Sequence, residues 1–178
     1  IKGKYHTQEE KYEAFKKLIK NETYIRTEYP SGGFVEKPVH LRQNKDEEPK
    51  NIDSAEFLAK EKGERIRLLP TNPFAPKSVP QLDAYSYTDN IIFEIKNPDS
   101  AIGSNAVQNS VKKANNQRAA VVFIRMSKEY TVEDISLGLK NSFMNDSNKN
   151  VKKIRIRLFD GSYKTYDADI LREQYREE

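Results

Sequence analysis

The chain contains no cysteine and has only two histidines, His6 and His40. The absence of cysteine excludes disulfides, zinc–thiolate sites and thiol nucleophiles. With so few imidazoles, we expect neither a catalytic triad nor a histidine-rich zinc site, so any metal chemistry would depend on carboxylates. No apolar run approaches the roughly 18 residues that a membrane helix needs, and we therefore expect no membrane-spanning segment.

Charged residues make up 33% of the 178 residues, and hydrophobic residues make up 36%. This composition predicts a polar protein with a modest core. The net charge of +4 is compatible with a polyanionic partner such as nucleic acid. The chain starts at Ile1 rather than at methionine and shows no signal-peptide pattern, so we expect it to be a piece of a longer protein.

The charged, proline-containing segment 43–50 predicts a boundary between an N-terminal extension, residues 1–50, and a main domain, residues 51–178. In the extension, residues 5–20 have helical periodicity, with Thr7 and Glu10 as a capping box. Residues 23–41 are strand-like and are interrupted at 30–33. The extension is therefore expected to contain a helix followed by strands.

The main domain alternates between helical and strand patterns in a regular order. A helix is predicted at 52–62 with Gly63 as its stop, then strands at 64–69, 82–87 and 91–96, a helix at 102–117 and a strand at 119–125. Because a helix joins the last two strands, the strand 119–125 should pair with the preceding sheet. The predicted fold class is α/β, an αβββαβ core with a mixed sheet and helices on both faces. A helix at 131–143, strands at 151–159 and 163–166, and a helix at 167–178 follow.

Strands 82–87 and 91–96 read as a hairpin that turns near Asp89 and Asn90. Folding it there places Asp83 opposite Glu94, and alternation puts Lys96 on the face of Glu94. Carboxylates on neighbouring strands can hold a divalent metal, and a nearby lysine can orient a water or neutralise developing charge. The same charges can also be ordinary cross-strand pairs, each worth about 0.2–1 kcal/mol of sheet stability.

An acid on the second core strand and Glu-x-Lys on the third resemble the PD-(D/E)xK nuclease superfamily, over residues 51–125. Asp83, Glu94 and Lys96 match its motif, and Glu56 matches the additional helix glutamate of many members. The residue before Asp83 is Leu82 rather than the motif proline. Within the superfamily, the chain looks like the C-terminal tRNA nuclease domains of contact-dependent growth inhibition toxins. This likeness includes residues 56–59, 68–70 and 113–117.

The resemblance implies a restriction-endonuclease-like core and a metal-dependent phosphodiesterase. Asp83, Glu94 and Glu56 would bind a divalent metal, Mg²⁺ above all, with Mn²⁺ or Zn²⁺ as alternatives. Lys96 would position the attacking water or stabilise the phosphorane. The resemblance further implies a toxin domain, delivered as the C-terminal part of a secreted or cell-surface protein. It would act on tRNA in the cytoplasm of a target bacterium, and a cognate immunity protein would neutralise it in the producer.

The predicted helix 102–117 offers a polar face for the nucleic-acid backbone, with Gln108, Lys112, Lys113 and Gln117 as candidate substrate-binding residues. A solvated helix surface is the simpler reading of each residue. Aromatic side chains on the predicted strands could stack on bases, although packing is the commoner use: Tyr85, Tyr87, Tyr163 and Tyr166. Arg155 and Arg157 form a basic stripe that suits either nucleic acid or an edge strand.

The residues leave two alternatives to an RNA-cleaving toxin. One is a DNA endonuclease of a phage or mobile element, because the phosphodiester chemistry is shared. The other is a non-catalytic nucleic-acid-binding module, in which the charges of the hairpin are structural.

Overall fold

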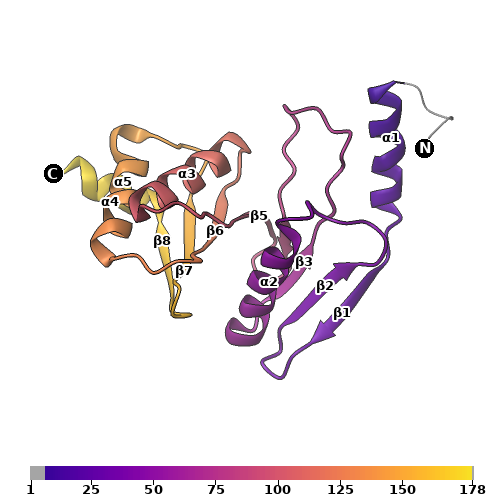
Figure 1. The fold of residues 1–178 in the computed structure, drawn as a ribbon, viewed down its shortest axis with the longest axis horizontal. Helices are drawn as coiled ribbons and strands as arrows, with labels where there is room; N and C mark the ends of the chain where they lie inside the picture. Colours follow the sequence, from indigo (N-terminus) through magenta and orange to yellow (C-terminus); the bar gives the residue numbers. More distant parts are fainter. Residues whose placement is uncertain (1–6, 178) are drawn as a thin grey trace. The chain divides into compact units, whose positions relative to one another are not determined.

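The computed structural model describes residues 7–177, and the chain divides between residues 91 and 92 into two compact units (Figure 1). The fold is mixed α/β, and the predicted helices and strands of the described part are confirmed with modest shifts at their ends. The predicted helix start at Tyr5, and His6, lie outside the described residues. Among the helices of this part, none is both long and apolar enough to cross a membrane.

The N-terminal unit contains a four-stranded sheet in the order β1-β2-β3-β4. Strands β1 and β2 are antiparallel, β2 and β3 are parallel, and β3 and β4 are antiparallel. Its elements are α1 (Gln8–Lys20), β1 (Tyr24–Glu28), β2 (Phe34–Pro38), α2 (Glu48–Lys62), β3 (Arg65–Leu68) and β4 (Ala84–Ser86). Because β2 pairs with β3, residues on both sides of the predicted boundary at residue 50 share one sheet.

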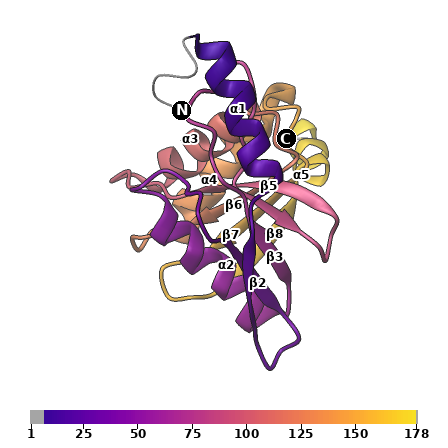
Figure 2. The same cartoon turned by 90° about the vertical axis from the view of Figure 1, so that its right-hand side faces the viewer.

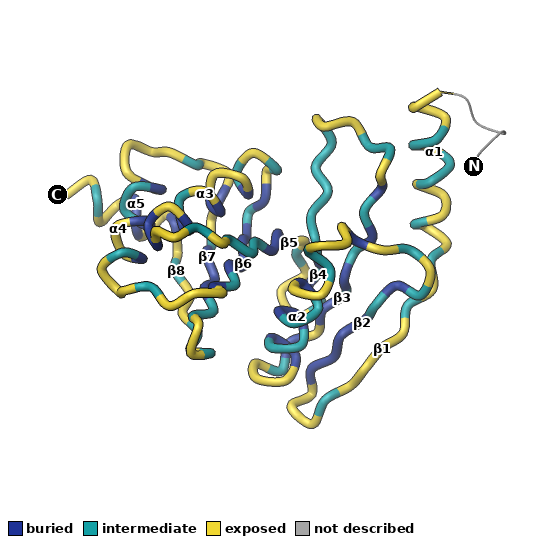
Figure 3. Tube along the Cα trace, viewed as in Figure 1, coloured by how far each residue is buried: buried dark blue, intermediate teal, exposed yellow. Residues whose placement is uncertain are grey.

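Helix α2 covers one face of this sheet (Figure 2). Val35, Ile66 and Leu68 project from β2 and β3 toward it and are buried, as are Ala55 and Leu58 of the helix. Strand β1 extends beyond this cover and is largely exposed, as the tube in Figure 3 shows. The apolar core of the unit therefore lies between α2 and the two central strands.

The helix predicted at 52–62 begins four residues earlier, at Glu48, so part of the predicted connector is helical. Pro49 is compatible with this start, because the amide of a first-turn residue has no partner within the helix. Asn51 lies within the added first turns of the helix, is buried, and donates from Nδ2 to Gln43 Oε1 at 3.1 Å. The predicted stop is confirmed, since Gly63 adopts the left-handed conformation with φ of +66°.

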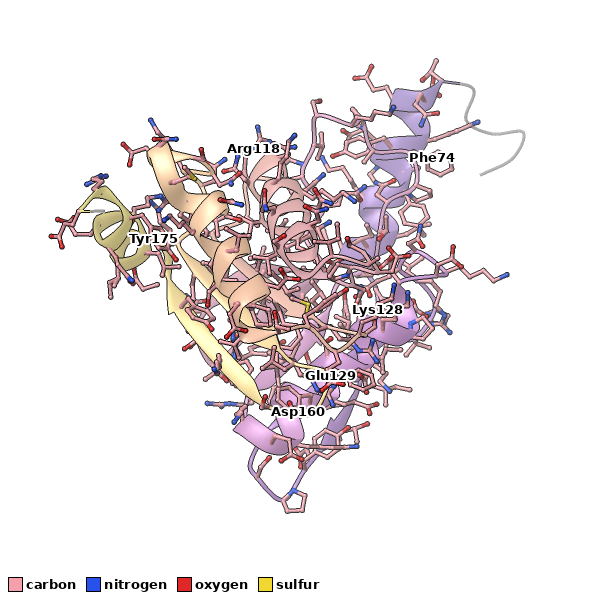
Figure 4. All side chains as sticks on the ribbon, turned by 60° about the vertical axis from the view of Figure 1, so that its left-hand side comes forward. Phe74, Arg118, Lys128, Glu129, Asp160 and Tyr175 are labelled. Atoms are coloured by element: carbon pink, nitrogen blue, oxygen red, sulfur yellow. The ribbon has the colours of Figure 1, made fainter. Side chains whose placement is uncertain are left out.

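Helix α1 packs against the proline-rich loop 70–82. The rings of Phe15 and Phe74 meet edge to face with centroids 6.0 Å apart, and Gln8 donates from Nε2 to the carbonyl oxygen of Phe74 at 3.2 Å (Figure 4). Asn72 donates to the carbonyl of Tyr12 at 3.2 Å. The Thr7 side chain accepts from the amide of Glu10, as expected for a cap. The helix and the loop thus fix each other.

The C-terminal unit contains a second run of paired strands, in the order β5-β6-β7-β8. Strands β5, β6 and β7 are parallel, so the predicted pairing of β6 with β5 is confirmed, and β8 is antiparallel to β7. The elements are β5 (Ile91–Lys96), α3 (Gly103–Asn116), β6 (Val121–Arg125), α4 (Val132–Phe143), a 3₁₀ turn (Met144–Asp146), β7 (Lys153–Arg157), β8 (Tyr163–Asp167) and α5 (Ala168–Arg176).

Helices α3 and α4 approach each other closely at Gly138. A Cβ atom at this position would lie 2.7 Å from the Cβ of Val107 and 2.9 Å from the carbonyl oxygen of Ser104. Val107 and Leu139 are buried beside this contact. The small residue therefore sets the distance between the two helices.

We expect Gly138→Ala to lower the free energy of unfolding by about 1–3 kcal/mol, because the added methyl group must push the two helices apart. Chemical denaturation measures this loss. Ser136→Ala, at an exposed position of the same helix, is the matched control and should change stability by less than about 0.5 kcal/mol. Equal stability of the two variants would show that the interface adapts at no cost.

Candidate functional site

Glu94 and Lys96 lie on the same face of β5, two residues apart. Their register partners on β6 are Val122 and Ile124, which fixes the face that they share. Lys96 Nζ lies 3.3 Å from Glu94 Oε2, so the two side chains form an ion pair. The C-terminal unit therefore brings the Glu and Lys of the predicted Glu-x-Lys motif into direct contact.

This face of the C-terminal sheet is the one covered by helices. Along the register it continues through Ile154 on β7 to Tyr166 on β8, and Tyr166 lines a cavity together with residues of α4 and α5. Glu94 is accordingly buried, with 4% of the residue exposed, whereas the Lys96 side chain retains 24% exposure at the end of the strand. A carboxylate thus occupies a position at which the neighbouring strands carry Val and Ile.

One oxygen of the Glu94 carboxylate lacks a donor. Oε1 is buried and forms no hydrogen bond with any residue in the described part of the chain. Buried polar atoms are nearly always hydrogen-bonded. A buried polar atom without a partner costs about 1–3 kcal/mol, and a charged one costs more. Such an atom is a position at which a cation, a water or a substrate group would be stabilised.

Asp83 belongs to the N-terminal unit, immediately before β4. Its carbonyl oxygen accepts from the amide of Leu69 at 2.9 Å and from Nε2 of Gln43 at 2.7 Å. These bonds continue the antiparallel register of β3 and β4, so alternation places the Asp83 side chain on the face of Tyr85, away from α2. The backbone at Asp83 is therefore fixed.

Glu56 lies on α2 and is engaged by lysines. Its carboxylate is 3.4 Å from Lys37 Nζ and 3.6 Å from Lys60 Nζ. Because α2 covers the opposite face of the N-terminal sheet, this unit does not bring Glu56 together with Asp83. Over residues 7–177, no group of three or more His, Asp and Glu side chains that could hold a metal ion is found.

The predicted substrate-binding residues lie on α3 or just beyond it. Lys112 and Lys113 are exposed, Gln108 is half-buried, and Gln117 forms the C-terminal cap of the helix. The helix contains no acidic residue. Bonds from Asn150 to Asn115 and from Lys152 to Ala120 hold the segment 150–152 against this end of the helix, which Figure 4 marks by its label at Arg118. This end of α3 exposes Lys112, Lys113 and Arg118, whereas Lys152 of the adjacent segment pairs with Asp169 at 3.9 Å.

The stripe predicted from Arg155 and Arg157 is not an edge-strand feature, because β7 pairs with both β6 and β8. Arg155 is 4% exposed and donates from Nε to the hydroxyl of Tyr163. The ring of Tyr163 stacks at 6.4 Å on that of Phe123. The packing interpretation of Tyr163 is thus supported, and Arg155 is a buried partner of this ring.

Sequence reasoning missed a polar network around Glu36 on β2, which is 5% exposed. Arg26 donates to Oε2 from Nη2 at 2.9 Å and from Nε at 3.1 Å. Arg67 Nε and the hydroxyl of Tyr87 each donate to Oε1 at 2.7 Å. Arg26 and Arg67 are the register partners of Glu36 on β1 and β3. The sequence shows the alternation within each strand, but it does not show which residues of different strands become partners, so the network could not be predicted from it.

This network controls the ionisation of Glu36. Burial alone would raise the pKa of the carboxyl, but hydrogen bonds from Arg67, Tyr87 and Arg26 outweigh burial and hold the pKa of Glu36 below its ordinary value. The folded state therefore binds a proton at Glu36 less readily than the unfolded chain does. The network consequently stabilises the fold above the unfolded pKa, about 4.3, and loses this effect as the pH falls through the folded pKa.

Comparison of the chain with models of protein families, with curated proteins and with solved structures finds no match in any of the three.

We expect Glu36→Gln to lower the free energy of unfolding at pH 7 by about 2 kcal/mol, because charged hydrogen bonds are replaced by weaker neutral ones. The difference from the parent should shrink as the pH falls below about 4, where Glu36 of the parent also becomes neutral. Denaturation curves between pH 3 and 7 measure both effects. Glu28→Gln, on the same face but exposed, should have little effect. A loss that is as large at pH 3 as at pH 7 would contradict this account.

Proposed function

We propose that this chain is a metal-dependent nuclease that cleaves RNA, with tRNA as its substrate, and that Glu94 and Lys96 belong to its active site. The observation that carries the proposal is the buried, donor-free Oε1 of Glu94, whose other oxygen contacts Lys96 at 3.3 Å. Buried polar atoms are usually hydrogen-bonded, so a buried carboxylate oxygen without a donor is a position at which a bound cation would be stabilised. Other buried polar atoms of the described residues share this property, among them Glu64 Oε1, but Glu94 is the one that also belongs to the Glu-x-Lys pair.

The order of elements supports the same reading. From α2 to β6 the chain runs helix, three strands, helix, strand, which is the αβββαβ order expected of a restriction-endonuclease-like core. Glu94 and Lys96 lie on the third of these strands, and α3 follows directly. The Glu-x-Lys pair therefore has the place in the element order that the resemblance to PD-(D/E)xK nucleases requires.

A divalent metal such as Mg²⁺, when bound, would supply a Lewis acid that polarises the phosphate and acidifies its water. In this proposal the free oxygen of Glu94 would hold the metal, and Lys96 would orient the water or neutralise charge that develops on the phosphate. Asp83 is included as the second carboxylate on the basis of the sequence motif. Glu56 is left out of the ligand set, because Lys37 and Lys60 hold its carboxylate on the α2-covered face.

Helix α3 is the proposed contact for the RNA backbone. It follows the Glu-x-Lys strand, carries no acidic residue, and exposes Lys112 and Lys113. Lysine contacts of this kind hold phosphates without reading sequence. The toxin setting, with delivery as part of a larger protein and neutralisation by an immunity protein, belongs to the proposal through the resemblance.

The test is cleavage of purified tRNA and of plasmid DNA by the same preparation, with Mg²⁺ and with EDTA. Glu94→Gln and Asp83→Asn should each reduce tRNA cleavage at least about 100-fold, because each removes a charged ligand. Glu129→Gln, an exposed glutamate of the C-terminal unit that Figure 4 labels, is the matched control and should retain full activity. Glu94→Gln should also melt at or above the temperature of the parent, because it removes an unmatched buried charge.

Cleavage of DNA alone would replace the RNA proposal with a DNA endonuclease. If neither polymer is cut and Glu94→Gln melts well below the parent, the pair is structural and the chain is a binding module.

We further expect Lys112→Gln with Lys113→Gln to raise the KM for tRNA about tenfold, with kcat nearly unchanged, because backbone contacts act on binding. The KM of this variant should also depend less steeply on salt concentration. Steady-state kinetics at several salt concentrations measures both quantities. Lys164→Gln, at an exposed position on β8, is the control. A fall in kcat without a change in KM would place these lysines in the chemical step instead.

A further inference from the structure

The face of the N-terminal sheet opposite α2 carries a cluster that we call the arginine–tyrosine face: Tyr24, Arg26, Glu36, Arg67, Tyr85 and Tyr87. Alternation and register place all of these side chains on one side of β1 to β4 or at its end. They come from four strands and therefore form a continuous surface. The proposed nuclease chemistry uses none of them.

Planar cations and rings alternate across this face. The Cζ atom of Arg67 lies 3.9 Å from the ring centroid of Tyr24, and that of Arg26 lies 3.9 Å from the ring of Phe34. The rings of Tyr85 and Tyr87 meet edge to face at 4.9 Å. Flat groups held in fixed orientations are the surfaces on which unpaired bases stack.

The arginines retain exposed surface and hydrogen-bonding capacity. Their side chains are 46% exposed for Arg26 and 33% for Arg67. Only Nε and Nη2 of Arg26 and Nε of Arg67 are bonded to Glu36. Among residues 7–177, no acceptor is found for Arg26 Nη1 or for either Nη of Arg67. These N–H groups can donate hydrogen bonds to the oxygens of a phosphate.

Glu36 makes this face rigid without making it acidic. Its carboxylate is buried and is shared by two guanidinium groups, so the two arginines outweigh the glutamate within this central cluster, whereas Glu28 and Asp83 lie farther along the same face. Because Glu36 fixes both guanidinium groups, little side-chain freedom remains to be lost on binding. The face is thus pre-organised for a partner that is flat and negatively charged.

We infer that the arginine–tyrosine face binds a single strand of nucleic acid, with bases stacked on Tyr24 and the Arg26 guanidinium and phosphates held by the remaining N–H groups of Arg67. The inference rests on the proposed function for its choice of nucleic acid as partner. A duplex keeps its bases stacked internally, so it offers phosphates but no base faces to this surface. The face therefore prefers unpaired segments, such as the loops of a folded RNA.

The experiment measures binding by fluorescence anisotropy, using the full chain with Glu94→Gln in EDTA so that no cleavage occurs. The probes are a single-stranded RNA, a DNA of the same sequence, and the RNA duplex. Tyr24→Leu and Arg26→Gln are introduced separately on this background. Lys37→Gln is the matched control, because Lys37 pairs with a glutamate and is similarly exposed at 39%, but projects toward α2. Melting curves verify that each variant is folded.

Single-stranded RNA should bind about tenfold more tightly than the duplex. Tyr24→Leu should weaken the single-strand complex about tenfold and Arg26→Gln about fivefold, whereas Lys37→Gln should change it less than about twofold. Equal binding of the DNA strand would assign the face to single strands in general, and preference for RNA would assign it to RNA. Equal losses in all three variants, or preference for the duplex, would overturn the inference.

This design separates the inference from the proposed function. A chain that cleaves tRNA but binds single strands equally well with Tyr24→Leu and Arg26→Gln overturns the inference alone. A chain that cleaves no nucleic acid but loses single-strand binding in these two variants, and not in the control, upholds the inference and overturns the nuclease proposal.

Discussion

A carboxylate withdrawn from water must recover its solvation from donors, and the two units of this chain meet that requirement in opposite ways. Glu36 in the N-terminal unit is surrounded by two arginines and a tyrosine hydroxyl. Glu94 in the C-terminal unit is as deeply buried but has one lysine and a bare oxygen. The first arrangement stabilises the fold, whereas the second leaves an electrostatic demand that a ligand can meet.

This contrast explains how the fold supports function. Surrounding packing must hold an undersolvated carboxylate in place, and Glu94 has that support from β6 and from the helix-covered face on which it lies. In the same way, Arg26 and Arg67 would be long, mobile side chains without the carboxylate beneath them. In each unit, the free energy of packing offsets the cost of holding polar groups in positions that they would not adopt alone.

Much of the fold was predictable because its elements are bounded by local chemistry. Gly63 ends α2 and Thr131 caps α4, and the β6 strand is an unbroken apolar run. The start of α2 at Glu48 was missed because the charged, proline-containing segment 43–50 has the composition of a connector. The bond from Asn51 to Gln43, which holds this segment in place, is formed only in the folded chain. The Glu94–Lys96 contact followed from alternation. The pairing of Glu56 with Lys37 and the Glu36 network depend on which strands become neighbours, and this is not encoded locally.

The bonds at the base of the proline-rich loop have a consequence for how the chain tolerates change. The amide of Leu69 donates a hydrogen bond to the carbonyl oxygen of Asp83, and Nε2 of Gln43 donates to the carbonyl oxygens of both residues. The loop between them is closed at its neck, so its length alters the closure entropy only logarithmically and leaves the register of β3 and β4 untouched. Segment 70–82 is therefore a place where insertions and deletions can accumulate during evolution, except at Asn72 and Phe74, which contact α1.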